Sequence, residues 1–305
     1  MEIKKVLLVG GGTMGVQIAT TLARHGFETW LLPYRSYLNY LDKEKKGGLD
    51  TLAKSDEFLE ATFGTIKKII QQWAEKGRLS SLEADQMLSR IIGTINLKDA
   101  IRDVDLVIES IPEDLETKKE FFRKFDALVP EKTVLATNTS ALSINEMAAV
   151  TKRPHRFLGL HFINPAPVNR HFEVVKGLDT SPEIIEMGLN FARKIDKVPV
   201  LCTDNAAFVI NRVLFAMTHE AILTLMDGVA SAEEIDKALV LGANHPIGPL
   251  ALADYVGLDL MLKLFESLHR EMGERYRPPL MLKQLVRAGH LGRKTGSGFF
   301  VYNKN

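Results

Sequence analysis

A strand, a glycine-rich turn and a helix open the chain, and this arrangement restricts the fold more than any other feature of the sequence. The apolar run at residues 3–9 is typical of a buried strand. The pattern G-x-G-x-x-G follows at residues 10–15, and apolar residues then recur at helical spacing. A second strand at residues 28–32 completes a βαβ unit. The order predicts a doubly wound α/β sheet that binds a dinucleotide where its first helix begins.

Each glycine of the pattern has its own physical role. Gly10 permits the tight turn, Gly12 lets backbone N–H groups approach a pyrophosphate, and Gly15 lets the helix pack close to the strand. Because a helix N-terminus carries partial positive charge, we expect the pyrophosphate beside Thr13 and Met14. A glycine-rich packing turn is the alternative, but it would not explain all three glycines in this context.

Composition places the chain among ordinary globular proteins. It has 305 residues, 46% apolar and 25% charged, and a formal net charge of +1. This charge does not favour nucleic acid or an anionic membrane as a partner. The single cysteine, Cys202, excludes an intramolecular disulfide and fits a reducing compartment. We find no signal peptide, no membrane-spanning run and no metal-site spacing, so we expect a cytoplasmic protein without a metal.

Strand and helix patterns alternate up to residue 203, and only helices are predicted beyond it. Further strands are predicted at residues 91–95, 105–110, 133–137 and 198–202. Helices are predicted at residues 58–74, 82–89, 115–129, 144–150, 182–194, 208–226, 231–241, 255–272 and 280–288. The polar segment 36–56 is predicted to be a surface loop or a short helical insertion. We therefore expect a Rossmann-like, mostly parallel domain at residues 1–203, followed by an all-helical domain at 204–305 that serves as a dimer interface or a lid.

A histidine and a glutamate twelve residues apart form a candidate catalytic pair. His161 ends an apolar run, so we expect it at the end of a buried strand, where open α/β sheets bind ligands. Prolines then interrupt the pattern, and a second apolar strand contains Glu173. A carboxylate in an apolar strand is costly unless paired, and beside an imidazole it can hold a general base in the right tautomer. A structural ion pair is the alternative.

Polar residues also follow two other predicted strands. Glu113 comes soon after the strand at 105–110, and Asn138 and Ser140 follow the strand at 133–137. Residues of these types are often turn or N-cap residues. Because they lie beyond successive strand ends, we favour a cleft in which Glu113 could meet the cofactor or the substrate and Asn138 could meet the cofactor, with Ser140 at the same edge.

The chain resembles the L-3-hydroxyacyl-CoA dehydrogenase family over essentially its full length. The motifs that carry the resemblance are the glycine pattern, ESIPED at 109–114, Asn138-Thr-Ser140, HFINP at 161–165 with Glu173, FVINR at 208–212 and GRKTGSGFF at 292–300. The resemblance implies oxidation of an L-3-hydroxyacyl-CoA by a nicotinamide cofactor. It implies that His161 accepts the hydroxyl proton, with Glu173 orienting the imidazole and Asn164 steadying it. It also implies that Ser140 and Asn211 hydrogen-bond the reacting oxygen.

The chain departs from the family at the end of the second strand. Pro33 stands where an acidic residue normally binds the adenosine ribose. Arg35 and Ser36 could instead receive a 2′-phosphate, because a guanidinium pairs with it bidentately. Asp42 or Glu44 could otherwise replace the missing carboxylate. We expect NAD as the cofactor, with NADP not excluded.

Lys67 and Lys68 lie on the helix predicted at 58–74 and could bind phosphates of coenzyme A. A merely solvated pair of lysines is the alternative.

The main hypothesis is a homodimeric enzyme acting on an acyl-CoA thioester. One alternative is a dehydrogenase of a free 3-hydroxy acid or sugar acid. The other is a non-catalytic dinucleotide-binding or crystallin-like protein, which the intact set of candidate catalytic residues disfavours.

Overall fold

The protein forms two compact units, Met1–Phe208 and Val209–Asn305, which we call the N-terminal and C-terminal units. The structure is a computed structural model that describes residues 2–43 and 49–302. At the end of the N-terminal unit, Ala207 and Phe208 have φ angles of 60° and 52°. These angles lie in the left-handed region that favours glycine.

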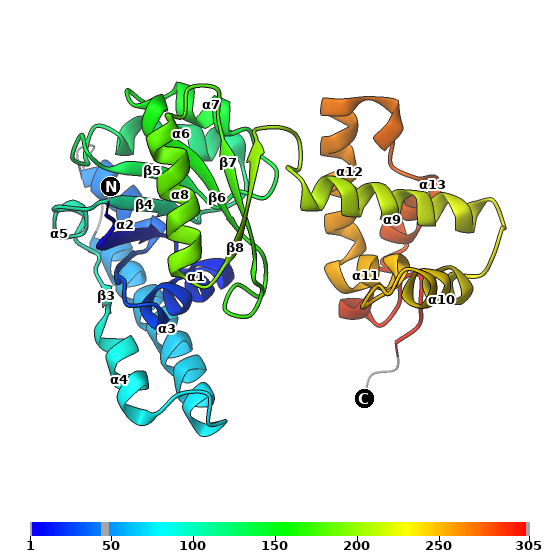
Figure 1. The fold of residues 1–305 in the computed structure, drawn as a ribbon, viewed down its shortest axis with the longest axis horizontal. Coiled ribbons are helices and arrows are strands. Elements are labelled where there is room, and N and C mark those ends of the chain that lie inside the picture. Colours follow the sequence, from blue (N-terminus) through cyan, green and yellow to red (C-terminus); the bar gives the residue numbers. More distant parts are fainter. Residues whose placement is uncertain (1, 44–48, 303–305) are drawn as a thin grey trace. The chain divides into compact units, whose positions relative to one another are not determined.

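An eight-stranded sheet is the centre of the N-terminal unit (Figure 1). Its order is β3-β2-β1-β4-β5-β6-β7-β8, and every neighbouring pair is parallel except β6 and β7. The strands are β1 (Lys5–Val9), β2 (Glu28–Leu32), β3 (Ile91–Gly93), β4 (Leu106–Glu109), β5 (Val134–Thr137), β6 (Phe157–Phe162), β7 (His171–Lys176) and β8 (Val198–Thr203). The predicted Rossmann-like, mostly parallel sheet is confirmed.

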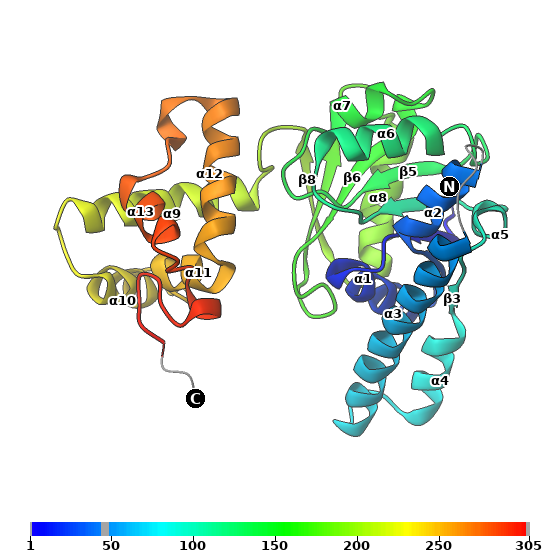
Figure 2. The same cartoon turned by 180° about the vertical axis from the view of Figure 1, so that it is seen from behind.

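Helices cover both faces of this sheet (Figures 1 and 2). One face packs on α1 (Thr13–Arg24), α3 (Leu49–Glu75), α4 (Ser81–Ser89) and α8 (Pro182–Lys194). The other packs on α2 (Tyr34–Lys43), α5 (Leu97–Ile101), α6 (Leu115–Phe125) and α7 (Ile144–Ala149). Along β1, Val6 and Leu8 belong to the first core and Leu7 and Val9 to the second. Burial on both faces explains why the strands are apolar throughout.

The loops after β1, β2 and β4 meet at the carboxyl edge of the sheet. Strand β1 lies between β2 and β4, so the strand order reverses here, which is where open α/β sheets bind ligands. Gly10 donates its N–H to the carbonyl of Leu32 at 2.9 Å. A Cβ on Gly10, whose φ is 113°, would lie 2.2 Å from the carbonyl oxygen of Ser110. Only glycine therefore fits this junction.

The segment predicted as a loop or a short helical insertion, residues 36–56, is helical on both sides of residues 44–48, which lie outside the described residues. It contains residues 36–43 of α2 and the first turns of α3. The predicted helix at 58–74 therefore begins earlier, at Leu49. The sequence has no proline or glycine between residues 49 and 58 that would stop a helix. The mixed polar composition concealed this continuity, because a solvated helix and a polar loop look alike in sequence.

The C-terminal unit is helical, as predicted. It contains α9 (Ile210–Met226), α10 (Ala232–Gly242), α11 (Pro249–Val256), α12 (Leu258–Met272) and α13 (Leu280–Arg287). The single helix predicted at 255–272 is wrong, because Gly257 separates α11 from α12. Gly257 has a φ of 102°, which an α-helix cannot contain.

A buried aspartate fixes the last described residues against α11. The carboxylate of Asp254, which is 1% exposed, accepts the N–H groups of Phe299 and Phe300 and the hydroxyl of Tyr302. A Cβ on Gly298 would lie 1.9 Å from this carboxylate. Gly298 of the C-terminal motif therefore has a structural explanation.

Candidate active site

The hairpin formed by β6 and β7 brings His161 and Glu173 together. The antiparallel register pairs the two residues directly. Nδ1 of His161 lies 2.7 Å from Oε2 of Glu173, and the two side chains are 7% and 0% exposed. With the Nδ1–H donated to the carboxylate, the neutral imidazole carries its lone pair on Nε2. The structure thus holds the imidazole against a buried carboxylate in a geometry that suits a general base, and this catalytic role stays a prediction.

Two other groups lie near this pair and are poorer candidates. Nε2 of His171 is 3.8 Å from Oε1 of Glu173, which is beyond hydrogen-bond distance. Burial, followed by the negative charges of Glu173 and Asp204, raises the pKa of the Cys202 thiol to about 12. A thiol with this pKa stays protonated near neutral pH and is a poor nucleophile.

Gln17 of α1 connects the loop after β6 to the first helix. Its Nε2 donates to Oδ1 of Asn164 at 2.9 Å, and its Oε1 accepts the N–H of Ala166 at 2.7 Å. Asn164 thus lies three residues after His161 and is held by α1. Its predicted support of the imidazole stays a prediction. No periodic pattern in the sequence points to Gln17, since its partners lie 147 and 149 residues away.

The predicted cleft residues after β4 and β5 contact one another. Oε1 of Glu113 accepts the hydroxyl of Thr139 at 2.5 Å and the N–H of Ser140 at 3.0 Å. Oδ1 of Asn138 accepts the N–H of Phe162, the residue after His161, at 2.9 Å. The structure therefore links Glu113, Asn138 and Ser140 to the strand that carries the histidine. Their contacts with cofactor and substrate stay predictions.

Sequence analysis missed a buried lysine behind these loops. Nζ of Lys118 lies 2.5 Å from Oε1 of Glu109 and 3.1 Å from Oε2 of Glu113. Lys118 is three, four and seven residues before Phe121, Phe122 and Phe125, all buried on α6. A lysine in register with an apolar helical stripe is the signal that would have found it.

The start of α1 fits a dinucleotide pyrophosphate. Its N-cap, Gly12, has no side-chain cap, and the first turn has no acidic residue. A Cβ on Gly12 would meet nothing within 4 Å, whereas one on Gly15 would lie 2.1 Å from the Gly10 carbonyl oxygen. Gly15 therefore packs directly against the turn, whereas the space beside Gly12 contains no protein atom. Uncapped N–H groups beside Thr13 and Met14 suit an anion.

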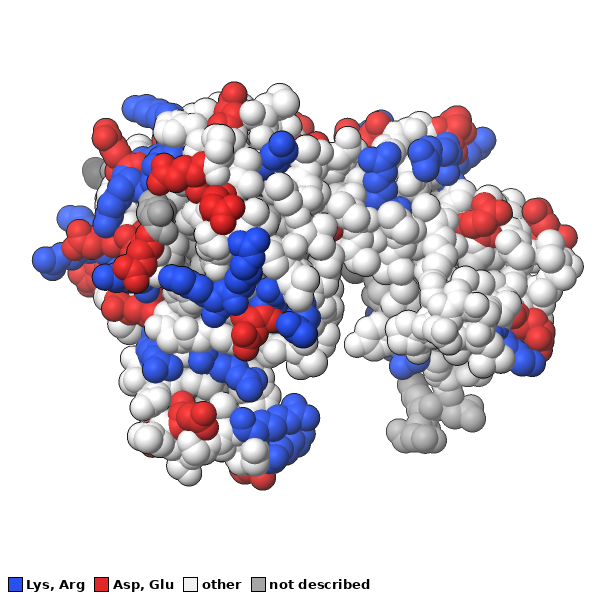
Figure 3. All heavy atoms as spheres, in the orientation of Figure 1, with Lys and Arg blue, Asp and Glu red and all other residues white. Residues whose placement is uncertain are grey.

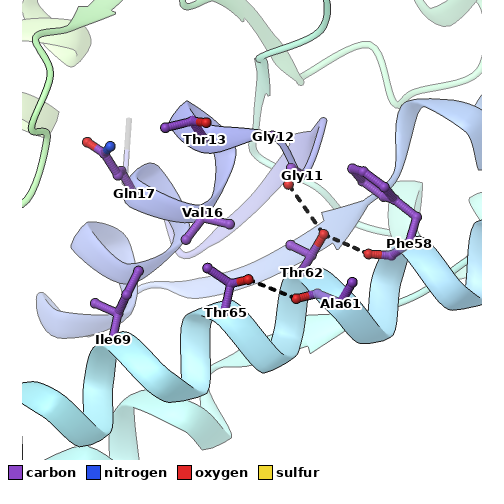
Figure 4. Close-up of a pocket in the computed structure, with 10 residues that line it drawn as sticks. All are labelled: Gly11, Gly12, Thr13, Val16, Gln17, Phe58, Ala61, Thr62, Thr65 and Ile69. Atoms are coloured by element: carbon purple, nitrogen blue, oxygen red, sulfur yellow. Dashed lines mark hydrogen bonds between the residues drawn. The ribbon is translucent and has the colours of Figure 1, made fainter. Parts of the chain in front are cut away.

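A cavity of about 350 Å³ lies beside the glycine turn (Figure 4). Residues of the turn and of α1 line one side, and residues of α3 line the other. The Thr62 hydroxyl lies 3.3 Å from the carbonyl oxygen of Gly11, which links the two sides. Phe58, Ala61 and Thr65 give the α3 side a mixed apolar and polar lining.

The remaining predicted site residues lie on three different helices. Arg35 is exposed in α2, Lys67 and Lys68 are exposed in α3, and Asn211 lies in α9 of the C-terminal unit. Asp42 and Glu44 are the proposed replacement acids. The structure describes neither the side chain of Asp42 nor any part of Glu44. The roles of all these residues stay predictions.

Metal and membrane signals are absent from the part of the chain that the structure describes. No group of three or more His, Cys, Asp or Glu side chains in residues 2–43 and 49–302 is arranged to hold a metal ion. None of the described helices combines the length and apolar character needed to cross a membrane.

Two protein-family models match the chain. Residues 5–205 match the NAD binding domain of 3-hydroxyacyl-CoA dehydrogenase, and residues 208–302 match the C-terminal domain of the same family.

Individual relatives align over nearly the whole of both chains. The probable 3-hydroxybutyryl-CoA dehydrogenase of Bacillus subtilis is 41% identical over 305 residues, which cover 100% of this chain and 99% of that protein. The crystal structure of (S)-3-hydroxybutyryl-CoA dehydrogenase from Ralstonia eutropha has a TM-score of 0.89 and 36% identity, and covers 99% of this chain and 100% of that one. The structure of a diketoreductase, described as acting on dicarbonyl compounds, has a TM-score of 0.80 and 30% identity at the same coverage.

Proposed function

Because the chain belongs to the 3-hydroxyacyl-CoA dehydrogenase family, we propose that it oxidises the 3-hydroxyl of an L-3-hydroxyacyl-CoA, or reduces the 3-ketoacyl-CoA, with a nicotinamide cofactor. The observation that carries the proposal is the 2.7 Å hydrogen bond between His161 and buried Glu173 at the end of β6. Relatives of similar length are named 3-hydroxybutyryl-CoA dehydrogenases. The start of α1 also fits the pyrophosphate of a dinucleotide cofactor.

In this proposal His161 moves the proton. A nicotinamide cofactor held at the start of α1 would supply the acceptor for the hydride at C3. His161 accepts the hydroxyl proton at Nε2, because its Nδ1–H is already donated to Glu173. The carboxylate stabilises the imidazolium that forms, and the C3–O bond becomes a carbonyl. Ser140 hydrogen-bonds the reacting oxygen. In the reductive direction the imidazolium returns the proton.

A free dicarbonyl or hydroxy acid is the second candidate substrate, which the similarity to the diketoreductase favours. A comparison of kcat/KM for acetoacetyl-CoA, longer 3-ketoacyl-CoAs and the free 3-keto acids decides between the two. We expect the thioesters to be reduced far more efficiently. A higher kcat/KM for the free acids would make the second candidate the function.

Of the two candidate lysines, we propose that Lys68 meets the phosphates of coenzyme A. On a helix, residues seven apart lie on one stripe, within about 20° of each other. Lys68 is seven residues after Ala61, which lines the cavity. Lys67 is about 120° from that stripe. Basic side chains also gather over the part of the N-terminal unit where α3 and α4 project (Figure 3).

We expect Lys68→Ala to raise KM for the thioester and Lys67→Ala to leave it unchanged. An exposed charge pair is worth up to about 1 kcal/mol, so the increase should be no more than about fivefold. It should be larger at low salt, because salt screens exposed charges. Steady-state kinetics of both variants at two ionic strengths measure this. Equal effects of the two substitutions would contradict the assignment.

We propose that the protein prefers NAD as its cofactor. We also propose that it discriminates against NADP less strongly than an enzyme with an acidic residue at the position of Pro33. Pro33 directly follows Leu32, whose carbonyl accepts the Gly10 N–H, so the place beside the glycine turn has no carboxylate of its own. Arg35 is exposed on the first turn of α2. The hydroxyl of Ser36, which is 2% exposed, has no hydrogen-bond partner among the described residues. These groups would tolerate a 2′-phosphate.

We therefore expect kcat/KM for NADH to exceed that for NADPH only modestly, by about tenfold or less. Arg35→Ala should raise the ratio of kcat/KM for NADH to kcat/KM for NADPH, because it removes a cation that pairs with the 2′-phosphate of NADPH. Kinetics of wild type and variant with both cofactors test this. A large preference for NADH in wild type would show that another acid replaces the missing one. A large preference for NADPH, lost in Arg35→Ala, would show that arginine has inverted the choice.

We also propose that the protein forms a homodimer through its C-terminal unit. Exposed apolar side chains on that unit, such as Val213, Leu241 and Val301, support this assembly. We propose the cytoplasm as its compartment, in keeping with its single cysteine.

A further inference from the structure

A charged residue occupies an apolar position of α6. Lys118 is 1% exposed and shares its stripe with Phe121, Phe122 and Phe125. These phenylalanines already attach α6 to the sheet core. A methionine at residue 118 would fill the same space without the cost of burying a charge. The ammonium therefore needs an explanation beyond packing.

Lys118 lies between two carboxylates, and we call Glu109, Lys118 and Glu113 the carboxylate–lysine relay. Nζ is 2.5 Å from Glu109 and 3.1 Å from Glu113. Burial alone would lower the pKa of Lys118, but the two carboxylates raise it above its usual value, so the side chain remains an ammonium. Glu109 is fixed in turn, because it accepts the Thr137 hydroxyl at 2.6 Å and the Ile111 N–H at 2.7 Å.

The outer end of the relay holds the loop after β5. Oε2 of Glu113 is paired with Lys118, while Oε1 accepts the Thr139 hydroxyl and the Ser140 N–H. The Glu113 side chain is 42% exposed. Without the ammonium, this carboxylate would gain water contacts and rotational freedom. Its two donors on the loop would then lose a fixed acceptor.

We infer that Lys118 is a positioning residue for catalysis: through Glu113, it holds the loop that presents Ser140 to the reacting oxygen. The inference rests on the proposed function, in which Ser140 hydrogen-bonds that oxygen. A donor displaced by about 1 Å can lower the rate as much as a hundredfold. The catalytic gain from a fixed loop can therefore offset the free-energy cost of burying a charge.

The test must separate positioning from stability. Lys118→Met alone would leave Glu109 buried and unpaired, which destabilises a fold. The double variant Glu109→Gln/Lys118→Met instead removes both charges. The amide introduced by Glu109→Gln can still accept the Ile111 N–H through its oxygen and donate to the Thr137 hydroxyl through its NH2 group. Lys119→Met is the matched control, because the neighbouring Lys119 pairs with Glu116 and Glu146 outside the relay.

We expect the double variant to lower kcat for acetoacetyl-CoA reduction by about tenfold or more. The Kd for NADH, measured by fluorescence, and KM should change much less. Glu113→Ala should cost about as much in kcat. The triple variant Glu109→Gln/Lys118→Met/Glu113→Ala should be no slower than Glu113→Ala alone, because Lys118 acts through Glu113. Lys119→Met should behave as wild type.

Three results would overturn the inference. The first is an unchanged kcat in the folded double variant. The second is a triple variant that loses the product of the two separate effects, because Lys118 would then act independently of Glu113. The third is a wild-type protein without thioester turnover, which refutes the proposed function itself and is recognised in the same assay.

A second variant keeps the test decisive if the double variant does not fold. Glu113→Asp keeps the charge at a partly exposed site but shortens the side chain, so it cannot reach both Lys118 and the loop. We expect the same loss in kcat with an unchanged melting temperature. Full activity in Glu113→Asp would contradict the inference.

Discussion

Replacing His161 with alanine is expected to lower kcat by at least about a hundredfold while leaving the affinity for NADH nearly unchanged. A positioned general base typically contributes about a hundred- to ten-thousandfold to the rate, and it acts on the chemical step. Glu173→Gln should be somewhat less harmful, since glutamine still accepts from Nδ1 but does not stabilise the imidazolium. Steady-state kinetics and NADH fluorescence titration measure both effects.

His171→Ala is the control for this experiment, because its imidazole lies 3.8 Å from the same carboxylate without a hydrogen bond to it. We expect this variant to retain most of the activity. An inactive His171→Ala beside an active His161→Ala would reverse the assignment of the base.

Gly12→Val is expected to weaken dinucleotide binding by at least about a hundredfold, roughly 2.7 kcal/mol, without unfolding the protein. The φ of Gly12 is −72°, which valine can adopt, and a Cβ there meets no protein atom within 4 Å. The added side chain would instead fill the space in which a pyrophosphate approaches the start of α1. Fluorescence titration with NADH and a thermal melt measure the two quantities.

Two other glycines separate ligand exclusion from general damage. Gly10→Val should lower the melting temperature, because residue 10 has a φ of 113° and faces the Ser110 carbonyl. Gly64→Val in α3 should leave both quantities unchanged, since its Cβ also meets open space but lies outside the cavity lining. Normal NADH affinity in Gly12→Val would contradict the proposed binding site.

The fold and the central pair were predictable because their signals are local. Apolar strand runs, the glycine pattern and the proline-rich turn define the sheet and the hairpin from neighbouring residues alone. The spacing of His161 and Glu173 then follows from antiparallel register, which pairs residues symmetrically about the turn.

The contacts that sequence analysis missed are ones that periodicity does not specify. The apolar stripe of α6 could have pointed to Lys118, but its pairing with Glu109 depends on how a strand and the following helix pack together. Gln17 meets Asn164 across 147 positions of sequence. The break at Gly257 was missed because both flanking segments keep helical apolar spacing, and a glycine within such a pattern is often tolerated.

Formation of NADH from NAD⁺ and L-3-hydroxybutyryl-CoA, followed by absorbance, is the decisive assay for the proposed function. We predict saturable turnover by the wild-type protein, with one NADH formed for each 3-ketoacyl-CoA, and its loss in His161→Ala. No NADH from this or any longer 3-hydroxyacyl-CoA would contradict the proposed function and leave a dehydrogenase of a free hydroxy acid or a non-catalytic dinucleotide-binding protein as the better description.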